Sequence, residues 1–180
     1  MAGKRQIALL RAVNLGPTNK VPMQQLREVL TGLGYGDVRT LATSGNVVLT
    51  SPMQGARLER ELEEVLAVRL GVETRVLVRT RRELAEVVDR NPLVEQAARG
   101  KGLHVTFLTD ALRAELTREL NAADVEPERI AVRGREIYLW LPEGQQRSQA
   151  VRLTADRNLE VTSTRRTWNV VTKLLALADG

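Results

Sequence analysis

The sequence predicts an α+β protein built from two tandem β-α-β-β-α-β units with antiparallel sheets. Three observations predict this fold. Short apolar or alternating runs typical of strands alternate with amphipathic helical runs, turn residues separate them, and the same order of elements occurs twice. A linker helix and a final helix complete the expected architecture. The hydrophobic fraction of 43% and the charged fraction of 27% are those of a globular chain.

The first unit is expected over residues 1–80. Its first helix carries apolar residues at helical spacing, and Pro22 suits its first turn. The second helix ends at Gly71, a typical C-terminal cap. This order is that of a ferredoxin-like unit. The expected elements are a strand at 5–13, a helix at 21–34, strands at 37–43 and 46–51, a helix at 56–71 and a strand at 73–80.

Residues 81–101 are expected to form a linker, with a short helix that stops at Asn91-Pro92 and a following loop. The second unit then covers residues 102–180. Asp110 is expected to cap its first helix, and Gly134 to turn its hairpin. The expected elements are a strand at 102–109, a helix at 110–120, a hairpin over 129–141, a helical segment at 148–158, a strand at 159–164 and a last helix at 165–178.

The residue types that are missing exclude several kinds of site. The chain has no cysteine, which excludes a disulfide scaffold, a thiol nucleophile and a cysteine-bound zinc. His104 is the one histidine, so a multi-histidine metal centre is excluded, although an all-oxygen magnesium site is not. The sequence identifies no metal ligands, and we predict no metal site. No apolar run approaches the roughly 20 residues that cross a bilayer. We therefore expect a cytoplasmic protein without a membrane partner.

The charge balance favours anionic partners. Lys and Arg number 27 against 22 Asp and Glu, a net charge of +5, and the pI is near 10.2. Such a charge suits nucleic acid, nucleotides or phosphorylated metabolites. It equally suits a protein whose charge only keeps it in solution. Residues 1–80 hold 11 Lys and Arg against 7 Asp and Glu, so the first unit is the expected owner of an anion-binding surface.

The stretch "LLRAVNLGPTNKVPM" (9–23) joins the first strand to the first helix and is the first candidate site. Arg11 can pair with a phosphate or carboxylate through two hydrogen bonds, Lys20 adds a point charge, and Asn14 can orient a polar ligand. The alternative is that Asn and Gly are present for turn geometry alone. The stretch does not contain the glycine-lysine pattern of a P-loop.

A second candidate is the turn Ser44-Gly45-Asn46, where Ser44 and Asn46 can donate hydrogen bonds at the end of a sheet. A plain hairpin turn explains the same residues. If both strands run their full length, we expect this turn at the end of the sheet opposite the loop that holds Arg11. The two candidates then do not share a site.

The third candidate is "TRRTWNVVTKLL" (164–175) in the last helix. Arg166, Asn169 and Lys173 are expected on one helix face, and Trp168 could stack on a base or ring. The alternative is a helix that packs through Trp168 and leaves a solvated basic face. His104 faces away from Leu103 and Val105 on its strand and is interpreted as a structural or surface group.

These stretches, together with "GYGDVRTLATSGNVVLTS" and "GREIYLWLP", resemble the bacterial family DUF1697, over nearly the whole chain. The resemblance implies a small α+β protein of two ferredoxin-like halves, and it implies no activity, cofactor or catalytic residue. Arg11, Asn14 and Lys20 match the pattern of the first loop, whereas Ala12 stands at a position usually occupied by glycine. Near the C-terminus Arg166, Trp168, Asn169 and Lys173 match. Gln149 stands where the pattern has lysine.

Three functions follow as hypotheses. The leading one is a cytosolic protein that binds a nucleotide, an RNA or a phosphorylated metabolite. The second is a small-molecule enzyme with its pocket between the two halves, and the third is a structural or protein-interaction module. The sequence names no catalytic residue and no cofactor, and it leaves open whether the protein is an enzyme. The residues expected to bind ligand are Arg11, Asn14, Lys20, Ser44, Asn46, Arg166, Trp168, Asn169 and Lys173.

Overall fold

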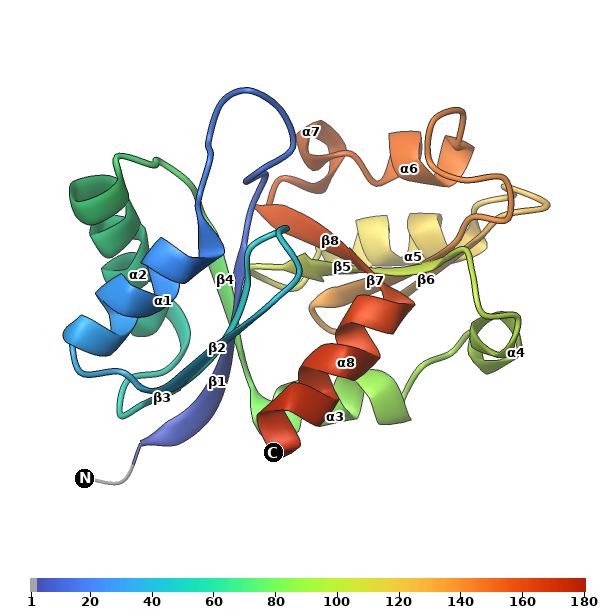
Figure 1. Cartoon of the computed structure of the whole chain (residues 1–180). Coiled ribbons are helices and arrows are strands. Elements are labelled where there is room, and N and C mark those ends of the chain that lie inside the picture. The colour runs from blue at the N-terminus through green and yellow to red at the C-terminus, as the bar shows by residue number, and fades with distance from the viewer. Residues whose placement is uncertain (1–2) are drawn as a thin grey trace. The chain divides into compact units, whose positions relative to one another are not determined.

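The computed structural model describes residues 3–180, and its elements follow the predicted order (Figure 1). The helices are α1 (Met23–Gly32), α2 (Gly55–Leu70), α3 (Arg81–Asp89), α4 (Val94–Ala98), α5 (Ala114–Ala122), α6 (Gln149–Leu153), α7 (Asp156–Leu159) and α8 (Trp168–Asp179). The strands are β1 (Lys4–Leu10), β2 (Gly36–Leu41), β3 (Asn46–Ser51), β4 (Val76–Thr80), β5 (Leu103–Leu108), β6 (Arg129–Arg133), β7 (Glu136–Trp140) and β8 (Ser163–Thr167). Within residues 3–180, no helix combines the length and apolar character needed to cross a membrane.

The strands form two four-stranded antiparallel sheets with the same topology. The first sheet has the order β2-β3-β1-β4, and the second has the order β6-β7-β5-β8. In each sheet the first strand of the unit lies beside the third and the fourth, which is the ferredoxin-like arrangement. The predicted α+β fold of two tandem β-α-β-β-α-β units is confirmed.

The chain divides into two compact units. One runs to Glu86 and includes Thr172–Gly180, and the other is Val87–Val171. The division falls within α3 and α8, so each of these helices has residues in both units.

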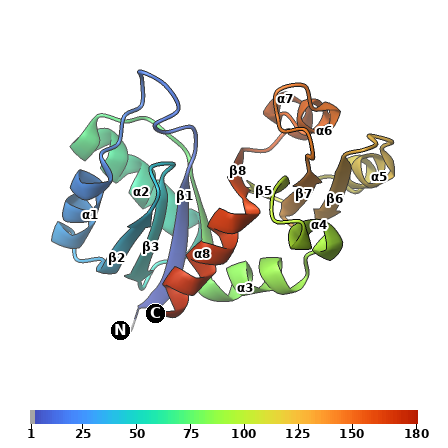
Figure 2. The ribbon, with the colours of Figure 1, turned by 45° about the vertical axis from the view of Figure 1, so that its right-hand side comes forward.

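In the first unit, α1 and α2 cover one face of the first sheet (Figure 1, Figure 2). Alternate residues of the central strands point to this face, as the two-residue period of a strand requires. The helices meet them with leucines at helical spacing. The buried residues of this core include Ala8, Leu10, Val47, Leu49, Val76 and Val78 from the sheet and Leu26, Leu30, Leu58, Leu62 and Leu66 from the helices.

In the second unit, α5, α6 and α7 supply the apolar residues that cover one face of the second sheet. Leu120, Ala150 and Leu159 come from the three helices, and Ile137 and Leu139 come from β7. On the opposite face Tyr138 is buried, and its hydroxyl donates to the carbonyl of Val87 at 2.7 Å. Burial raises the pKa of this phenol well above its ordinary range.

The last helix begins three residues later than predicted. Residues 163–167 pair with β5 as strand β8, so the helix predicted from residue 165 starts at Trp168. The polar run "STRRT" has no apolar alternation, and only its pairing to β5 identifies it as a strand. The helix of the second unit likewise begins at Ala114 with Arg113 at its N-cap, not with Asp110.

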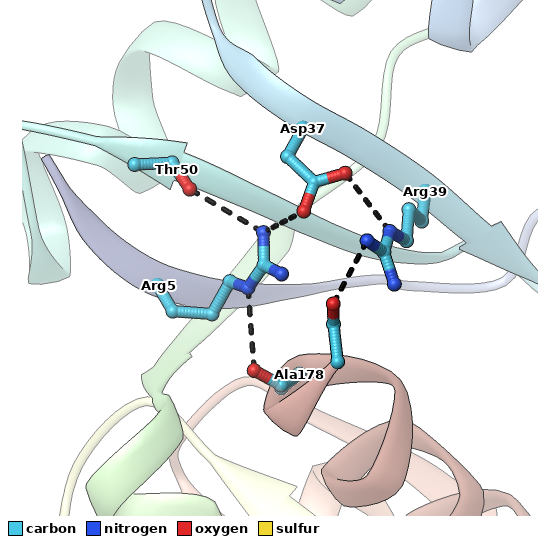
Figure 3. Close-up of polar contacts among 6 residues, drawn as sticks. Arg5, Asp37, Arg39, Thr50 and Ala178 are labelled. Carbon is cyan, nitrogen blue, oxygen red and sulfur yellow. Dashed lines mark hydrogen bonds and ion pairs between the residues drawn. The ribbon is translucent and has the colours of Figure 1, made fainter.

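The final turn of α8 is held to the first sheet by arginine side chains (Figure 3). Arg5 Nε donates to the carbonyl of Ala178 at 3.3 Å, and Arg39 Nη2 donates to that of Gly180 at 3.1 Å. Asp37 pairs with both arginines, at 2.5 Å from Arg5 Nη1 and 2.9 Å from Arg39 Nε. Hydrogen bonds from Arg39 and Arg5 hold the pKa of Asp37 below its usual value. Cations at a helix C-terminus also stabilise the helix, because they interact favourably with the negative end of its dipole.

Candidate functional site

Three connections meet at the end of the first sheet where strand β1 finishes (Figure 1). We call this end of the sheet the β1 edge and define it by residues 10–20, 42–46 and 71–76. The N–H of Leu10 donates to the carbonyl of Gly45 at 2.8 Å, and the N–H of Arg11 donates to that of Arg75 at 2.9 Å. The hydroxyl of Thr74 donates to the carbonyl of Arg11 at 2.5 Å. The loop, the turn and the connection from α2 to β4 are therefore bonded to one another.

The expectation that the Ser44-Gly45-Asn46 turn lies opposite the first loop is wrong. Strands β1 and β2 are both antiparallel to β3, so they run parallel to each other and end at the same edge. Leu9 of β1 pairs with Asn46 at the start of β3. As a result Ser44 and Asn46 share the β1 edge with Arg11 and Asn14.

Asn14 holds the first loop closed. Its amide nitrogen donates to the carbonyl of Val21 at 3.0 Å and to that of Thr43 at 2.6 Å. Its side-chain oxygen accepts from the N–H of Val21 at 2.9 Å. The φ angle of 56° is left-handed, a conformation that asparagine tolerates better than most residues. These bonds fix the shape of the loop, and they account for Asn14 without a ligand.

Ser44 and Asn46 perform a similar task in the turn. The buried amide of Asn46 donates to the carbonyl of Leu41 at 2.9 Å and to the hydroxyl of Ser44 at 2.9 Å. Between them Gly45 has a φ of 74°, and a Cβ there would lie 2.6 Å from side-chain atoms of Leu10 and Val13. Only glycine allows the turn to approach β1 this closely. Both polar side chains are therefore used to build the edge.

An open pocket with a volume of about 420 Å³ lies at the β1 edge. Of the residues predicted to bind ligand, Arg11 lines it, and Asn19 of the same loop does so as well. The full lining consists of Arg11, Ala12, Asn19, Glu63, Ala67, Glu73, Thr74 and Arg75.

The charged groups of the pocket are two guanidinium groups and two carboxylates. Glu63 is fixed on the wall, because its Oε1 accepts from Arg75 Nε at 2.9 Å and from the N–H of Val76 at 2.9 Å. The Arg75 side chain is 59% exposed, so its ion pair with Glu63 adds little to stability. The described residues, 3–180, contain no group of three or more His, Asp or Glu side chains placed to hold a metal ion.

The pocket residues Glu63, Glu73, Thr74 and Arg75 were not predicted from the sequence. A signal for two of them exists, because Thr74 and Arg75 lie at the start of the strand predicted at 73–80 and just before the observed strand β4. In a β-α-β-β-α-β unit the fourth strand is antiparallel to the first, so the connection before it must arrive at the end of β1. Topology therefore points to residues 71–75. Glu63 instead reaches the edge from the middle of α2.

The two predicted lysines are both exposed. Lys20 ends the first loop but does not line the pocket, and Lys173 lies on α8. The structure therefore keeps Arg11, Asn14 and Lys20 on one loop and adds Ser44 and Asn46 at the same edge.

The predicted helix face of Arg166, Asn169 and Lys173 is wrong, because Arg166 belongs to strand β8. Arg166 pairs with Val105 of β5 and is buried. Its Nη1 donates to the hydroxyl of Thr164 at 2.8 Å and to the carbonyl of Arg165 at 2.8 Å. Burial lowers the pKa of Arg166 to about 10.

Trp168 and Asn169 begin α8, and with Arg166 they belong to the second unit, whereas Lys173 belongs to the first. Trp168 is half-buried and Asn169 is exposed. Asn169 and Lys173 remain on α8 four residues apart, the spacing that places them on a common helix face.

Comparison with known proteins gives a family and a fold. The family model described as "Protein of unknown function (DUF1697)" matches residues 4–138, which include the whole β1 edge. The structure of the conserved bacterial protein SP0830 from Streptococcus pneumoniae is similar, with a TM-score of 0.72 at 21% sequence identity. That likeness covers 97% of this chain and 98% of the other. A comparison with curated proteins found no match.

The likeness to SP0830 concerns the fold alone, because the sequence identity is low. The family match has a wider meaning, since it covers well over half of the chain and includes the Arg11 loop, the Ser44 turn and the pocket. It ends before Arg166 and Trp168, so the predicted residues near the C-terminus lie outside the matched segment. On this evidence the chain belongs to the DUF1697 family.

Proposed function

We propose that this cytosolic protein binds a small phosphorylated ligand, a mononucleotide or a phosphorylated metabolite, in the pocket at the β1 edge. The observation that carries the proposal is that Arg11 and Arg75 both line one pocket, which Asn19 lines as well. Guanidinium groups bind phosphate oxygens through paired, charge-assisted hydrogen bonds.

The size of the pocket supports a small ligand. Its volume of about 420 Å³ falls in the range of roughly 300–1,000 Å³ that is usual for small-molecule sites. Glu63 and Glu73 would repel a bare polyanion, but they can accept hydrogen bonds from sugar hydroxyls. A phosphate joined to a sugar offers both kinds of group, which is why a mononucleotide or sugar phosphate fits better than a long RNA.

The rigidity of the edge supports binding as well. The bonds made by Asn14, Asn46 and Thr74 hold the pocket wall in place before a ligand arrives. A site that is already ordered loses less conformational entropy on binding, so its contacts yield more affinity.

The test is calorimetric titration of the full chain with a panel of mononucleotides, sugar phosphates and a short single-stranded RNA at 50 and 200 mM salt. We expect at least one small phosphorylated compound to bind and to bind more weakly at the higher salt. Arg11→Gln should weaken it about tenfold or more, as the loss of a charge-assisted hydrogen bond implies.

The matched control is Arg57→Gln, which removes an exposed arginine from the first turn of α2, away from the pocket. It should leave the affinity within about twofold of the parent chain. Equal losses of affinity in the two variants would show that only the net charge of the protein matters, and they would contradict a site at the β1 edge. Binding of the RNA alone would replace the small ligand by a nucleic acid.

A further inference from the structure

A chain of polar side chains crosses the helix-covered face of the second sheet. His104 and Thr106 lie on β5, opposite Leu139 and Ile137 of the apolar core, and Arg165 pairs with Thr106 from β8. Thr106 is buried, and its hydroxyl accepts from Arg165 Nε at 3.0 Å. Polar groups in such a position are expected to be hydrogen-bonded, and these are.

Gln145 closes this chain from outside the sheet. It belongs to the exposed loop after β7, and its amide bridges two groups. Arg165 Nη1 lies 3.2 Å from its Oε1, and His104 Nε2 lies 3.2 Å from its Nε2.

The bridge fixes the proton on the imidazole. Arginine only donates, so the amide oxygen faces Arg165 and the amide nitrogen, a donor, faces His104. His104 Nε2 must therefore accept, and Nδ1 carries the proton and donates to the carbonyl of Gly102 at 3.0 Å. Burial lowers the pKa of His104, the bond to Gly102 opposes this, and the charge of Arg165 lowers it further. In this hydrogen-bond arrangement the imidazole is neutral, and its Nε2 lone pair accepts from Gln145.

The Gln145 amide occupies a position that suits a carboxylate. A planar carboxylate could accept from Arg165 Nη1 with one oxygen and, once His104 is protonated, from Nε2–H with the other. We propose that His104, Arg165 and Thr106 form a second binding site, for a small-molecule carboxylate, and that Gln145 occupies it in the absence of that ligand. This site is separate from the phosphate site proposed at the β1 edge.

The exposure of Gln145 makes the exchange feasible. The side chain is on the surface, so it can rotate away from His104 and Arg165 without unpacking the core. The other neighbours of His104 on this face are Leu139 and Thr167, which carry no charge, while Asp156 is the carboxylate that acts on Arg165. A carboxylate entering beside Arg165 would therefore bring a negative charge next to His104.

A tethered carboxylate provides the first test. Because His104 is the one histidine of the chain, its imidazole Cε1–H gives a single NMR signal whose pKa can be read in the intact protein. Gln145→Glu should raise the pKa of His104 clearly, because the glutamate can accept from the protonated ring. Gln146→Glu adds the same charge one residue away on the same exposed loop. Equal pKa changes in the two variants would overturn the proposal.

A free carboxylate provides the second test. Acetate added to Gln145→Ala at pH 6 should shift the His104 signal saturably and bind about tenfold or more tightly than to the parent chain or to Gln146→Ala. Sodium chloride at matched ionic strength should not reproduce the shift. Arg165→Gln in the Gln145→Ala background should abolish saturation. A linear shift in Gln145→Ala, or a saturable one that survives Arg165→Gln, would overturn the site.

If the double variant does not fold, Thr106→Val in the Gln145→Ala background serves in its place, because it disturbs Arg165 while keeping its charge. Saturation by acetate should then weaken at least severalfold, and an unchanged affinity would contradict the role given to Arg165.

Discussion

The two sheets have the same topology, yet they differ in the polar side chains that the first strand of each unit places on the helix-covered face. In the first sheet Gln6 of β1 lies fully buried on the helix-covered face, opposite Leu49 and Thr80, and among the described residues neither polar atom of its amide has a hydrogen-bond partner. In the second sheet His104 and Thr106 occupy the same face of β5 and are joined to Arg165 and Gln145.

The difference shows that topology does not decide where polar chemistry is placed. In the first unit the core cluster between the sheet and its two helices consists of apolar side chains, and the hydrogen-bonded amides of Asn14 and Asn46 lie at the β1 edge. In the second unit hydrogen-bonded polar groups run through the sheet, because a long loop after β7 returns an amide to its face. A buried polar group lowers stability when no loop supplies it with a hydrogen-bond partner. When a loop does supply one, the bonded groups can form a specific site.

The largest effect is expected at the β1 edge, from Asn14→Ala. The change removes three hydrogen bonds and leaves a left-handed residue without the side chain that supports it. We expect the free energy of unfolding, measured in urea, to fall by about 2–3 kcal/mol. Asn19→Ala is the control, since Asn19 has a similar φ of 52° and an exposed side chain. A loss no larger than that of Asn19→Ala would mean that the Asn14 bonds do not hold the edge.

Replacing a buried polar side chain by an apolar one should have opposite signs in the two sheets. Gln6→Met removes a buried amide that has no hydrogen-bond partner among residues 3–180, and it should raise the free energy of unfolding by about 1–2 kcal/mol. Thr106→Val removes the partner of Arg165 and should lower it by about 1–2 kcal/mol. Denaturant unfolding of both variants measures the two changes in the free energy of unfolding, and Gln25→Met, at an exposed position, is the control. If the two changes had the same sign, the contrast between the sheets would fail.

A smaller effect is expected at Ala12, whose φ of 51° is left-handed. Ala12→Gly relieves about 1–2 kcal/mol of strain and increases the entropy of the unfolded chain, so stability should rise by about 0.5–1 kcal/mol. Ala67→Gly, in an exposed part of α2, should instead lower it by about 1 kcal/mol. Thermal unfolding of the two variants side by side decides the matter. Two losses of equal size would show that Ala12 is not strained.

The smallest effect is a pH dependence that belongs to the second sheet. Burial lowers the pKa of His104, so the unfolded chain takes up a proton before the folded chain does. The contribution of the neutral imidazole to stability is therefore fully present above the ordinary histidine pKa of 6.5 and should be lost as the pH falls below it. The slope of unfolding free energy between pH 7 and 5 measures this. His104→Gln should flatten that slope, and a slope unchanged by the substitution would contradict a lowered pKa.

Much of the fold could be predicted because the apolar periods are local. The leucines of α1 and α2 and the alternation in β1 and β3 follow rules that hold within a few residues. Strand β8 was misplaced because "STRRT" lacks that alternation, and its neighbour β5 supplies the pairing. Arg166 was accordingly placed on a helix when it lies in a sheet.

The candidate site was predicted in part. Arg11 and its loop were identified from their polar residues, and the pocket contains Arg11 and Asn19. Thr74 and Arg75 were missed, because they follow Arg11 by more than sixty residues and approach it only through the antiparallel pairing of β1 and β4.

By itself the sequence determined the order of helices and strands, the two β-α-β-β-α-β units and the polar loop after the first strand, because each depends on spacing within a short segment. Only the tertiary structure decided which of those polar groups face a pocket and which hold a turn. It also joined Gln145 to His104 and Arg165, and within residues 3–180 it left the side-chain amide of Gln6 without a hydrogen-bond partner. The reason is that a hydrogen bond between distant residues depends on strand register and on the path of the loops, which the pattern of any one segment does not contain.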